Sequence, residues 1–551
     1  MNETAKTLIF VLLAAALIAG AFFCRPTAPE FKVEEMVGKS LFPQFTDPLG
    51  IKSLEIVKFG ATGTRNDFRI IEVNGIWSIP SHDNYPADAK DQMGKVAEAL
   101  TDLKVLEVIP PDESGNDAIA FQTQYGVIDP AAESASLGNG IGTKITLGGA
   151  NNETLVNLII GKEVALSRRS QDMMGGNETS LRYVRIADQS PVYVINVDPS
   201  QFATNFDQWI EKNLLDISTF DIKEIFVDEY SFSVELALTN RGLQETPKAS
   251  FIGDITLSYD GSAVGAEKWS LVRWMTFEGQ NLEYKERQLE QDKELDTDTL
   301  DSMISALNDL KIVSVQKKPM ELASALREGK PLEDIKTDTS MQETGFYLVE
   351  LPDLKRDTKK TKVQLLSNEG DIQLRLNNGI VYNLRFGDLT GTESEMATDD
   401  SPDTESITGV NRYLFITAEF DPAILSLPEL KPVPEVPAEG EAEELSKLTQ
   451  EKEAIEKGNQ REQERYDTEI ESGKKRAAAL SDRFANWYYV IAEDVYKKIH
   501  LTETNVFRAK TSEGEPAPNL MDIPDLPELE LPQIPSPADH LSDLPSVDVE
   551  E

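Results

Sequence analysis

The end of one helix occurs twice in this chain: residues 99–108 read ALTDLKVLEV, and residues 306–315 read ALNDLKIVSV. Before each copy come a hydrophobic run, a dipeptide of Asn or Asp with Gly, and a second run that contains a tryptophan. The dipeptides and tryptophans are Asn74-Gly75 and Trp77 in the first copy, and Asp260-Gly261 and Trp269 in the second. Because Asn, Asp and Gly tolerate positive φ, each copy is expected to form a β-hairpin at this dipeptide.

An amphipathic helix is expected after each hairpin. Pro86 and Asp88 are of the types that open a helix, and Asp296 and Asp298 do the same in the second copy. Apolar residues three or four positions apart then lie on one face of each helix. They are Val96, Leu100 and Leu103 in the first helix, and Met303, Leu307 and Leu310 in the second.

Four short runs rich in Ile, Val, Leu, Tyr and Phe follow each helix in matching order. They read TKITLGG, NLIIGKEV, LRYVRI and VYVINVD in the first copy, and TKVQLLS, NLRFGDLT, NRYLFI and YYVIAED in the second. Matched blocks in the same order predict an internal duplication. The expected fold class is α+β, with two tandem repeats of hairpin, helix and antiparallel strands over residues 45–218 and 219–510.

The N-terminus contains an uncharged apolar segment from Leu8 to Cys24, about the minimum length that crosses a bilayer. We interpret residues 1–25 as a retained transmembrane anchor, with the N-terminus inside, and residues 26–44 as a linker. A cleaved signal peptide ending near Ala19-Gly20-Ala21 and a lipid-modified Cys24 are the alternatives. All three place the body outside the cytoplasm, on the periplasmic side of an inner membrane.

The charge balance argues against one class of partner. The chain has 54 basic and 96 acidic residues, a formal net charge of -42. Such a chain repels phosphate backbones, so nucleic acid is excluded as a partner class. Cys24 is the single cysteine of the sequence, which excludes a disulfide within the chain and a thiolate metal cluster.

The second repeat carries two insertions. Residues 388–408 form an acidic loop, and a charged helical insertion is expected at about 430–480. Its sparse apolar stripe consists of Leu445, Leu448, Ile455, Tyr466, Ile470, Ala477, Leu480 and Phe484. Gly458 and Gly473 are expected to interrupt the helix. A helical hairpin that offers a face to a partner and a single exposed helix stabilised by its own charge pairs both fit this pattern.

The C-terminal residues 511–551 are rich in proline and acids, and we expect them to be disordered. The recurring Leu-Pro pairs fit either a passive spacer or a segment that docks into a partner groove.

Residues that carry chemistry are few. The three histidines, His82, His500 and His540, have neither metal-ligand spacing nor an H-E-x-x-H pattern. Arg168 and Arg169 form a basic pair in an expected surface loop, and LGNGIG is a glycine-rich turn. The acids are so numerous that no carboxylate pair stands out as a catalytic pair. We therefore identify no catalytic, cofactor-binding or metal-binding residue, and expect a chain that is not an enzyme and has no cofactor.

Several of these motifs together resemble a bacterial family. The leader, the IWSIP…YPAD step, the ALTDLKVLEV helix end, YGVIDP at 125–130 and VYVINVDPSQF are similar to proteins with domain of unknown function 4340. The second repeat departs from this pattern, since ETGFYLVELP replaces the Tyr-Gly step. The resemblance extends over most of residues 45–510. It implies a membrane-anchored protein of the cell envelope, in some members similar to companions of ABC-type transport systems related to gliding-motility auxiliary proteins.

The expected function is that of a non-enzymatic interaction or accessory subunit, with ABC-transporter subunits as candidate partners. The alternatives are a glycan-binding protein or hydrolase of the envelope, and a structural envelope protein that self-associates through strand edges.

Overall fold

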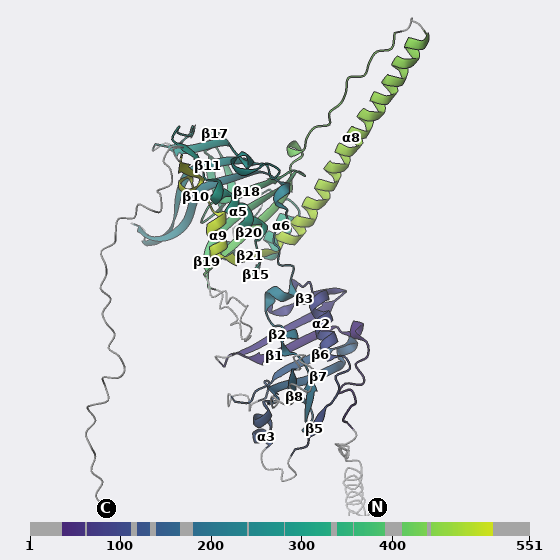
Figure 1. The fold of residues 1–551 in the computed structure, drawn as a ribbon. Helices are drawn as coiled ribbons and strands as arrows, with labels where there is room; N and C mark the ends of the chain where they lie inside the picture. Colours follow the sequence, from purple (N-terminus) through teal and green to yellow (C-terminus); the bar gives the residue numbers. More distant parts are fainter. Residues whose placement is uncertain are drawn as a thin grey trace, which may run out of the picture. The chain divides into compact units, whose positions relative to one another are not determined.

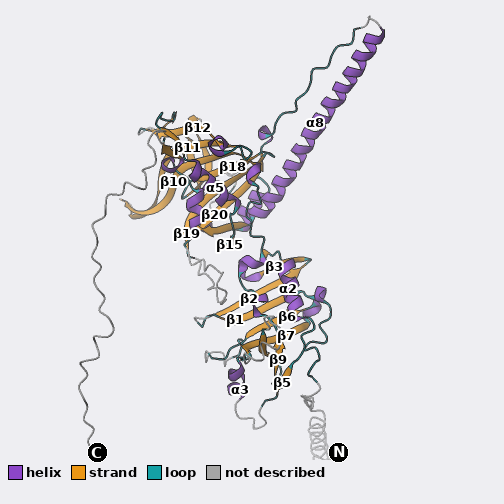
Figure 2. Ribbon diagram, in the orientation of Figure 1, coloured by secondary structure: helices purple, strands orange, loops and turns teal. Residues whose placement is uncertain are grey.

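The computed structural model describes residues 36–510 except 61–62, 112–117, 133–138, 166–179, 240–241, 280–281, 332–334, 336–338, 356, 392–409 and 438–441. The chain is of mixed α+β class, and its strands hold more residues than its helices (Figure 2). Two nine-stranded sheets, in which every pair of neighbouring strands is antiparallel, contain most of the strands.

The first of these, here called the N-terminal sheet, has the strand order β4-β3-β2-β1-β6-β7-β8-β9-β5 (Figure 1). Its strands are β1 (Ser53–Phe59), β2 (Arg65–Val73), β3 (Ile76–Ile79), β4 (Tyr85–Pro86), β5 (Glu107–Ile109), β6 (Thr143–Gly148), β7 (Thr154–Glu163), β8 (Leu181–Ile186) and β9 (Val192–Asn196). Helix α2 (Lys90–Leu100) connects β4 to β5, which lie at opposite edges of the sheet, and α3 (Ala118–Tyr125) precedes β6.

The second sheet, here called the C-terminal sheet, has the order β13-β12-β11-β10-β18-β19-β20-β21-β15. Its strands are β10 (Ile222–Thr239), β11 (Gly242–Tyr259), β12 (Trp269–Glu278), β13 (Glu283–Glu286), β15 (Ser314–Lys317), β18 (Asp371–Leu376), β19 (Ile380–Thr390), β20 (Asn411–Phe420) and β21 (Trp487–Ala492). Its helices are α5 (Thr297–Asn308), α6 (Met320–Arg327), α7 (Thr339–Glu343), α8 (Ala442–Ala485), α9 (Glu493–Ile499) and α10 (Glu503–Val506). The strand orders of the two sheets correspond position by position.

Two smaller sheets complete the strands. Strands β16 (Phe346–Asp353) and β17 (Asp357–Ser367) pair only with each other, as do β14 (Lys293–Leu295) and β22 (Phe507–Ala509). The run TKVQLLS, which we matched to TKITLGG, lies in β17 and outside the nine-stranded sheet. That match is therefore wrong: the strand in the place of β6 is β18, DIQLRL, because the β16–β17 hairpin is inserted before it.

The main core lies on one face of each sheet, under α2 or α5. The predicted helix faces are confirmed within the helices, because Val96 and Leu100 on α2 and Met303 and Leu307 on α5 are buried. The other two predicted members, Leu103 and Leu310, are also buried but follow the ends of the helices. Asp296 caps α5 as predicted, its side chain accepting from the backbone N–H of Thr299. In contrast, α2 begins only at Lys90, after Pro86 and Asp88.

The two predicted hairpin turns differ. Asn74 and Gly75 both have positive φ and join β2 to β3 as a two-residue turn, as predicted. Asp260 and Gly261 instead begin a longer loop, because the pairing of β11 with β12 ends at Tyr259 and Trp269. The hairpin predicted at this second site therefore forms, with a longer connection than the first.

Helix α8 is a single helix of 44 residues and passes through both Gly458 and Gly473. The predicted interruption at these glycines is wrong, and of the two interpretations of the insertion the structure has the single helix. A Cβ at Gly473 would collide with the ring of Phe420 on β20, so that this glycine allows the helix to pack closely. No atom lies within 4 Å of a Cβ placed at Gly458.

Several predicted features lie outside the described residues: the segment Leu8–Cys24, Arg168 and Arg169, most of the acidic loop 388–408, His540 and the tail 511–551. Within the part of the chain that the structure describes, no helix combines the length and the apolar character that a membrane span needs.

Candidate functional site

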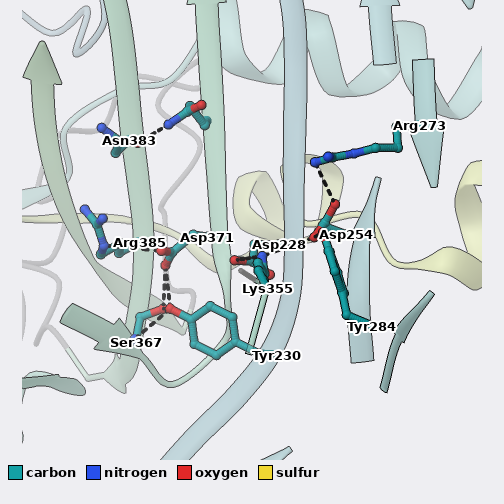
Figure 3. A network of polar contacts seen from close by, with 11 residues as sticks. Asp228, Tyr230, Asp254, Arg273, Tyr284, Lys355, Ser367, Asp371, Asn383 and Arg385 are labelled. Atoms are coloured by element: carbon teal, nitrogen blue, oxygen red, sulfur yellow. Dashed lines mark hydrogen bonds and ion pairs between the residues drawn. The ribbon is translucent and has the colours of Figure 1, made fainter. Parts of the chain in front are cut away.

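The face of the C-terminal sheet opposite α5 carries a network of charged side chains, of which Asp254 is buried and Asp228, Lys355, Asp371 and Arg385 are partly shielded from solvent (Figure 3). Asp228 on β10 and Asp254 on β11 are direct partners in the strand ladder. Lys355, from the turn between β16 and β17, places its Nζ 2.7 Å from Asp228 Oδ2 and 3.2 Å from Asp254 Oδ2. One ammonium group therefore links the inserted hairpin to two neighbouring strands.

Asp254 is surrounded by further donors, and its side chain has no exposed surface. Tyr284 on β13 donates its hydroxyl proton to Asp254 Oδ2, and Arg273 Nη2 on β12 lies 3.5 Å from Oδ1. Figure 3 shows both side chains pointing at this carboxylate from the side opposite Asp228. Burial together with the contact to Asp254 raises the pKa of the Tyr284 hydroxyl, so the tyrosine keeps its proton at neutral pH.

A second cluster lies next to the first, around Asp371 on β18. Tyr230 donates to Asp371 Oδ1 at 2.7 Å and accepts from the backbone N–H of Ser367 at 3.0 Å. Arg385 Nε on β19 lies 3.3 Å from Asp371 Oδ2. Ser367 ends β17, so this cluster attaches the second strand of the hairpin to the sheet.

The protonation of Asp228 depends on its position in this network. Burial raises its pKa to about 6, since removal from water disfavours the carboxylate, while Lys355 opposes this shift and Asp371 and Asp254 add to it. Burial raises the pKa of Asp371 as well, against the effect of Arg385. Near neutral pH, Asp228 is ionised and depends on Lys355 for its charge balance.

The chemistry open to this network is limited by space. Lys355 occupies the position between the two carboxylates, where a substrate would have to bind. A cavity beside these strands has about 10 Å³, lined among others by Glu229, Gly253 and Thr276. This volume is enough for one water molecule. The network therefore fixes the β16–β17 hairpin on the sheet, an arrangement that needs no ligand.

The N-terminal sheet has different residues at the corresponding positions. Gly161 on β7 and Gly387 on β19 both lie at an irregularity in the pairing with the next strand. When these two glycines are taken as equivalent positions, the strands of the two sheets can be aligned residue by residue. In this alignment Val57 takes the place of Asp228, Lys144 that of Asp371, and Ile159 that of Arg385. Lys144 pairs instead with Asp129, at 2.8 Å.

These two glycines share one packing role. A Cβ at Gly161 would come 2.4 Å from the carbonyl oxygen of Tyr125, and one at Gly387 2.1 Å from that of Thr344. In each sheet, a chain segment crosses the strand at this glycine. The segment follows a short helix, α3 or α7, and contains a glycine with positive φ, Gly126 or Gly345. The Tyr-Gly step thus has a counterpart in Thr344-Gly345, which the sequence comparison missed.

Both sheets also bury cations away from the clusters described above: Arg185 in the N-terminal sheet, and Lys318 and Arg412 in the C-terminal sheet. Arg185 on β8 donates to the carbonyl oxygens of Val127, Ala187 and Gln189. Lys318, after β15, donates to the carbonyl oxygen of Phe484 at the C-terminal end of α8, where the helix dipole favours positive charge. Its Nζ also lies 3.8 Å from the ring centre of Phe415. Burial, with Arg385 nearby, lowers the pKa of Lys318 well below its usual value.

The two described histidines are packed against aromatic rings. His82 stacks on Phe206 with ring centres 4.0 Å apart, and His500 stacks on Tyr496 at 5.0 Å. Burial lowers the pKa of both, to about 4 for His500, so both are neutral at pH 7. No group of three or more His, Cys, Asp or Glu among the described residues is placed to hold a metal ion.

The largest exposed feature is the projecting part of α8. No residue between 443 and 472 is buried, whereas the base of the helix packs on the sheet through Gly473, Ala477 and Phe484. Figure 1 shows this helix extending past the strands it packs on, with an extended segment running back beside it. That segment, residues 428–437, is here called the strap. The strap and residues 443–472 of α8 are together called the arm.

The comparison with protein families gives one match. Residues 77–327 match the family described as domain of unknown function (DUF4340), which confirms the family that the sequence resembles. The matched region runs from β3 to the end of α6 and is narrower than the 45–510 that the resemblance suggested. Neither a curated protein nor a solved structure matches the chain.

Proposed function

We propose that this DUF4340-family chain is a membrane-anchored interaction or accessory protein of the cell envelope, without enzymatic activity, and that the arm is its contact with a protein partner. An ABC-type transport system is the candidate partner, on the ground of the family resemblance. The observation that supports this role is the exposure of the arm. Thirty consecutive residues of α8, from 443 to 472, include no buried side chain.

The internal bonds of the arm explain how such a helix persists in water. Ion pairs at helical spacing join Lys447 to Glu443, Lys452 to Glu456, and Arg465 to both Glu462 and Glu469. Each exposed pair contributes only a few tenths of a kcal/mol. A helix that extends this far from its core adds little stability to the fold, so we assign it a role in contacting another molecule.

The proposed location rests on the N-terminal segment. Leu8 to Cys24 would anchor the chain in the inner membrane, and the acidic body would lie on the periplasmic side. We further propose that the two sheets arose by internal duplication, which their corresponding strand orders support. The arm belongs to the second copy only, so that duplication followed by insertion would give one copy a new contact surface.

The contact between the strap and α8 allows the outer part of the arm to be deleted without removing its base. Asn459 on α8 and Lys431 on the strap are hydrogen-bonded at 2.8 Å, so the chain can be joined at this point. A variant in which a short Gly-Ser linker replaces residues 432–458 loses the outer half of the arm and keeps the base. We expect ABC-transporter subunits to co-purify with the tagged full chain from native membranes in mild detergent, and to be lost with this variant.

A matched control replaces Asp494 and Lys497, an exposed ion pair of α9, with alanine. This variant should retain the same subunits. If the full chain and the arm variant both purify alone, or with the same proteins, the arm is not the partner contact and the proposal fails.

A second candidate role, self-association through strand edges, is favoured by the long β10–β11 hairpin. Pairing of β10 with β18 ends at Asp228, and pairing of β11 with β12 begins at Gly253, so the outer part of the hairpin extends beyond its pairing with these two strands. Leu236, Leu238 and Leu243 lie on one face there and are 70–83 % exposed. Analytical ultracentrifugation of the full chain and of a Leu236→Ser/Leu238→Ser variant tests this role. An oligomer of the full chain that is absent in the variant would support it, and any other result would contradict it.

A further inference from the structure

The strap is held on α8 by one amide side chain. Asn459 Oδ1 accepts from the backbone N–H of Lys431 at 2.8 Å, and Asn459 Nδ2 donates to the carbonyl oxygen of Lys431 at 2.7 Å. Both bonds go to the backbone, and the side chain of Lys431 is exposed. The helix therefore fixes the strap at this point without using a strap side chain.

The large apolar side chains that the arm exposes lie on the strap. Leu430 is 53 % exposed and Val433 is 41 % exposed. Within residues 443–485 of α8, no Val, Leu, Ile, Met, Phe, Tyr or Trp is exposed. The apolar residues of the projecting part of α8 are partly shielded and lie on the same side of the helix as Asn459: Leu445, Leu448, Ile455, Tyr466 and Ile470. Because burial of apolar surface drives most protein association, the strap is the part of the arm that can supply it.

The sequence of the strap favours one extended conformation. Its prolines are Pro428, Pro432, Pro434 and Pro437. Lys431 and Val433 each precede a proline, which disfavours the helical region of φ and ψ for both. Polyproline II has three residues per turn, so Leu430 and Val433 are expected on the same side of the strap. The strap thus exposes an apolar side of its own.

The backbone of the strap is poorly suited to pairing with a strand of another protein. Such pairing uses the backbone groups of every second residue. One alternate set contains Pro428, Pro432 and Pro434, which have no N–H to donate. The other set has Lys431 at its centre, and both backbone groups of Lys431 are bonded to Asn459. A partner must therefore bind the strap through its proline rings and side chains.

We propose that the strap is the part of the arm that the partner protein binds, and that the partner holds it in a groove lined by aromatic side chains. Such grooves bind proline-rich segments in the polyproline II conformation. Glu429 and Glu435 are exposed and the chain has a formal net charge of -42, so a groove with a basic rim is complementary to the strap. This inference rests on the proposed function and names the contact residues and the class of partner surface.

Helix α8 has a supporting role in this contact. An extended segment loses conformational freedom when it binds, which lowers affinity, and a segment that is already ordered loses less. The bonds from Asn459 order the strap before the partner arrives. The charged sides of α8 border the contact and add little apolar surface to it.

A Leu430→Ser/Val433→Ser variant of the full chain tests which part of the arm is bound. Its bonds to Asn459 involve only the backbone of Lys431, so unchanged circular dichroism is expected. We expect the amount of ABC-transporter subunits that co-purifies from native membranes to fall at least tenfold, because two apolar contacts are lost. Val73→Ser/Ile76→Ser is the matched control, since these side chains are 54 % and 62 % exposed on the N-terminal sheet. It should retain the subunits.

A Pro432→Ala/Pro434→Ala variant tests the class of partner surface. Each substitution removes a proline ring and restores a backbone N–H. An aromatic groove should bind this variant more weakly than the unchanged chain, whereas a partner that pairs as a strand should bind it as well or better. Equal or stronger co-purification of the transporter subunits would overturn the assigned groove.

Failure of this inference is distinguishable from failure of the proposed function. If the serine variant of the strap retains the subunits while the variant lacking residues 432–458 loses them, α8 itself is the contact. That result overturns the inference and leaves the proposed function standing. If the unchanged full chain purifies without transporter subunits, both fail.

Discussion

The N-terminal and C-terminal sheets share one strand order and differ in what covers their second face. On the N-terminal sheet this face is a small apolar cluster of Val127, Ile159 and Val192, with α3 packed against it through Phe121 and Tyr125. On the C-terminal sheet it holds the carboxylates that bind Lys355 and Arg385. The first face is apolar and helix-covered in both sheets.

The difference has a physical consequence for the inserted β16–β17 hairpin. A hairpin with only two strands is marginally stable by itself. Here it gains apolar contacts through Phe346, Tyr347, Leu365 and Leu366, and its turn is fixed by a partly shielded ion pair between Lys355 and Asp228. The cover of the C-terminal sheet thus combines apolar contacts with ionised partners, and this difference from the N-terminal sheet can be measured.

Breaking the Lys355 contact should have the largest effect. Lys355→Met leaves Asp228 and Asp254 buried without their shared cation, and we expect a loss of about 3 kcal/mol in the stability of the C-terminal sheet. Lys144→Met in the N-terminal sheet leaves only Asp129, which is partly exposed, so about 1 kcal/mol is expected. Hydrogen exchange resolved on peptides of β10 and β6 measures each sheet separately. Equal losses would contradict the comparison.

The pH dependence of stability should also distinguish the two sheets. The folded pKa of Asp228 is raised to about 6, above its unfolded value, so the folded state binds more protons between about pH 4 and pH 6. Stability from this group is therefore fully present at low pH and is lost as pH rises through 6, by about 3 kcal/mol.

His500 acts in the opposite direction over the same range. Its folded pKa of about 4 lies below the unfolded value, so it costs stability as pH falls from about 6.5 to 4. The effect of Asp228 must therefore be read as a difference between the unchanged chain and Asp228→Asn. We expect the variant to gain in relative stability of the C-terminal sheet from pH 4 to pH 7 in exchange measurements. A constant difference would contradict the assigned pKa.

Substitution of Gly161 and of Gly387, the glycines at which a segment crosses the strand, should destabilise the two sheets to a similar extent. Gly161→Ala and Gly387→Ala each introduce a methyl group into contact with a backbone carbonyl, and about 2 kcal/mol is expected for either. Similar losses would show that the two sheets share this packing contact on their second face. The free energy of unfolding is measured by chemical denaturation. A large loss for one variant and none for the other would show that the crossing segment stabilises only one of the two sheets.

The two glycines of α8 should give the smallest effects, of opposite sign. Gly458→Ala is expected to stabilise the helix by about 0.5–1 kcal/mol, since nothing opposes the added methyl group. Gly473→Ala should destabilise it, because Phe420 must move. Helix content followed by circular dichroism during thermal unfolding compares the pair. Stabilisation by both would mean that the base of α8 packs more loosely than described.

Local pattern predicted the parts of the fold that depend on periodicity. The faces of α2 and α5 follow from the spacing of their apolar residues, and the turn at Asn74-Gly75 from residue type. The β6 counterpart was misassigned because TKVQLLS begins with the same two residues as TKITLGG, although β18 is the strand in the sheet. Pattern alone does not show that a hairpin has been inserted before the matching strand.

The charged network could not be predicted, for a different reason. Asp228, Asp254 and Lys355 are far apart in the sequence, and the two acids are among 96. Only the ladder that pairs Asp228 with Asp254 brings the carboxylates together. The alternation of Asp228 and Tyr230 with buried Ile225 and Val227 was the available signal, since it places polar groups on the face that the inserted hairpin covers.

We propose that the arm is the part of the chain that contacts a partner protein. Site-specific photo-crosslinking in native membranes tests it most directly, with a photoreactive residue at Glu464 on the exposed side of α8 and, for comparison, at Glu55 on β1, both of which are exposed. We predict one discrete higher-mass product from position 464 that contains a transporter subunit, and none from position 55. The same products from both positions, or none from position 464, would contradict the account.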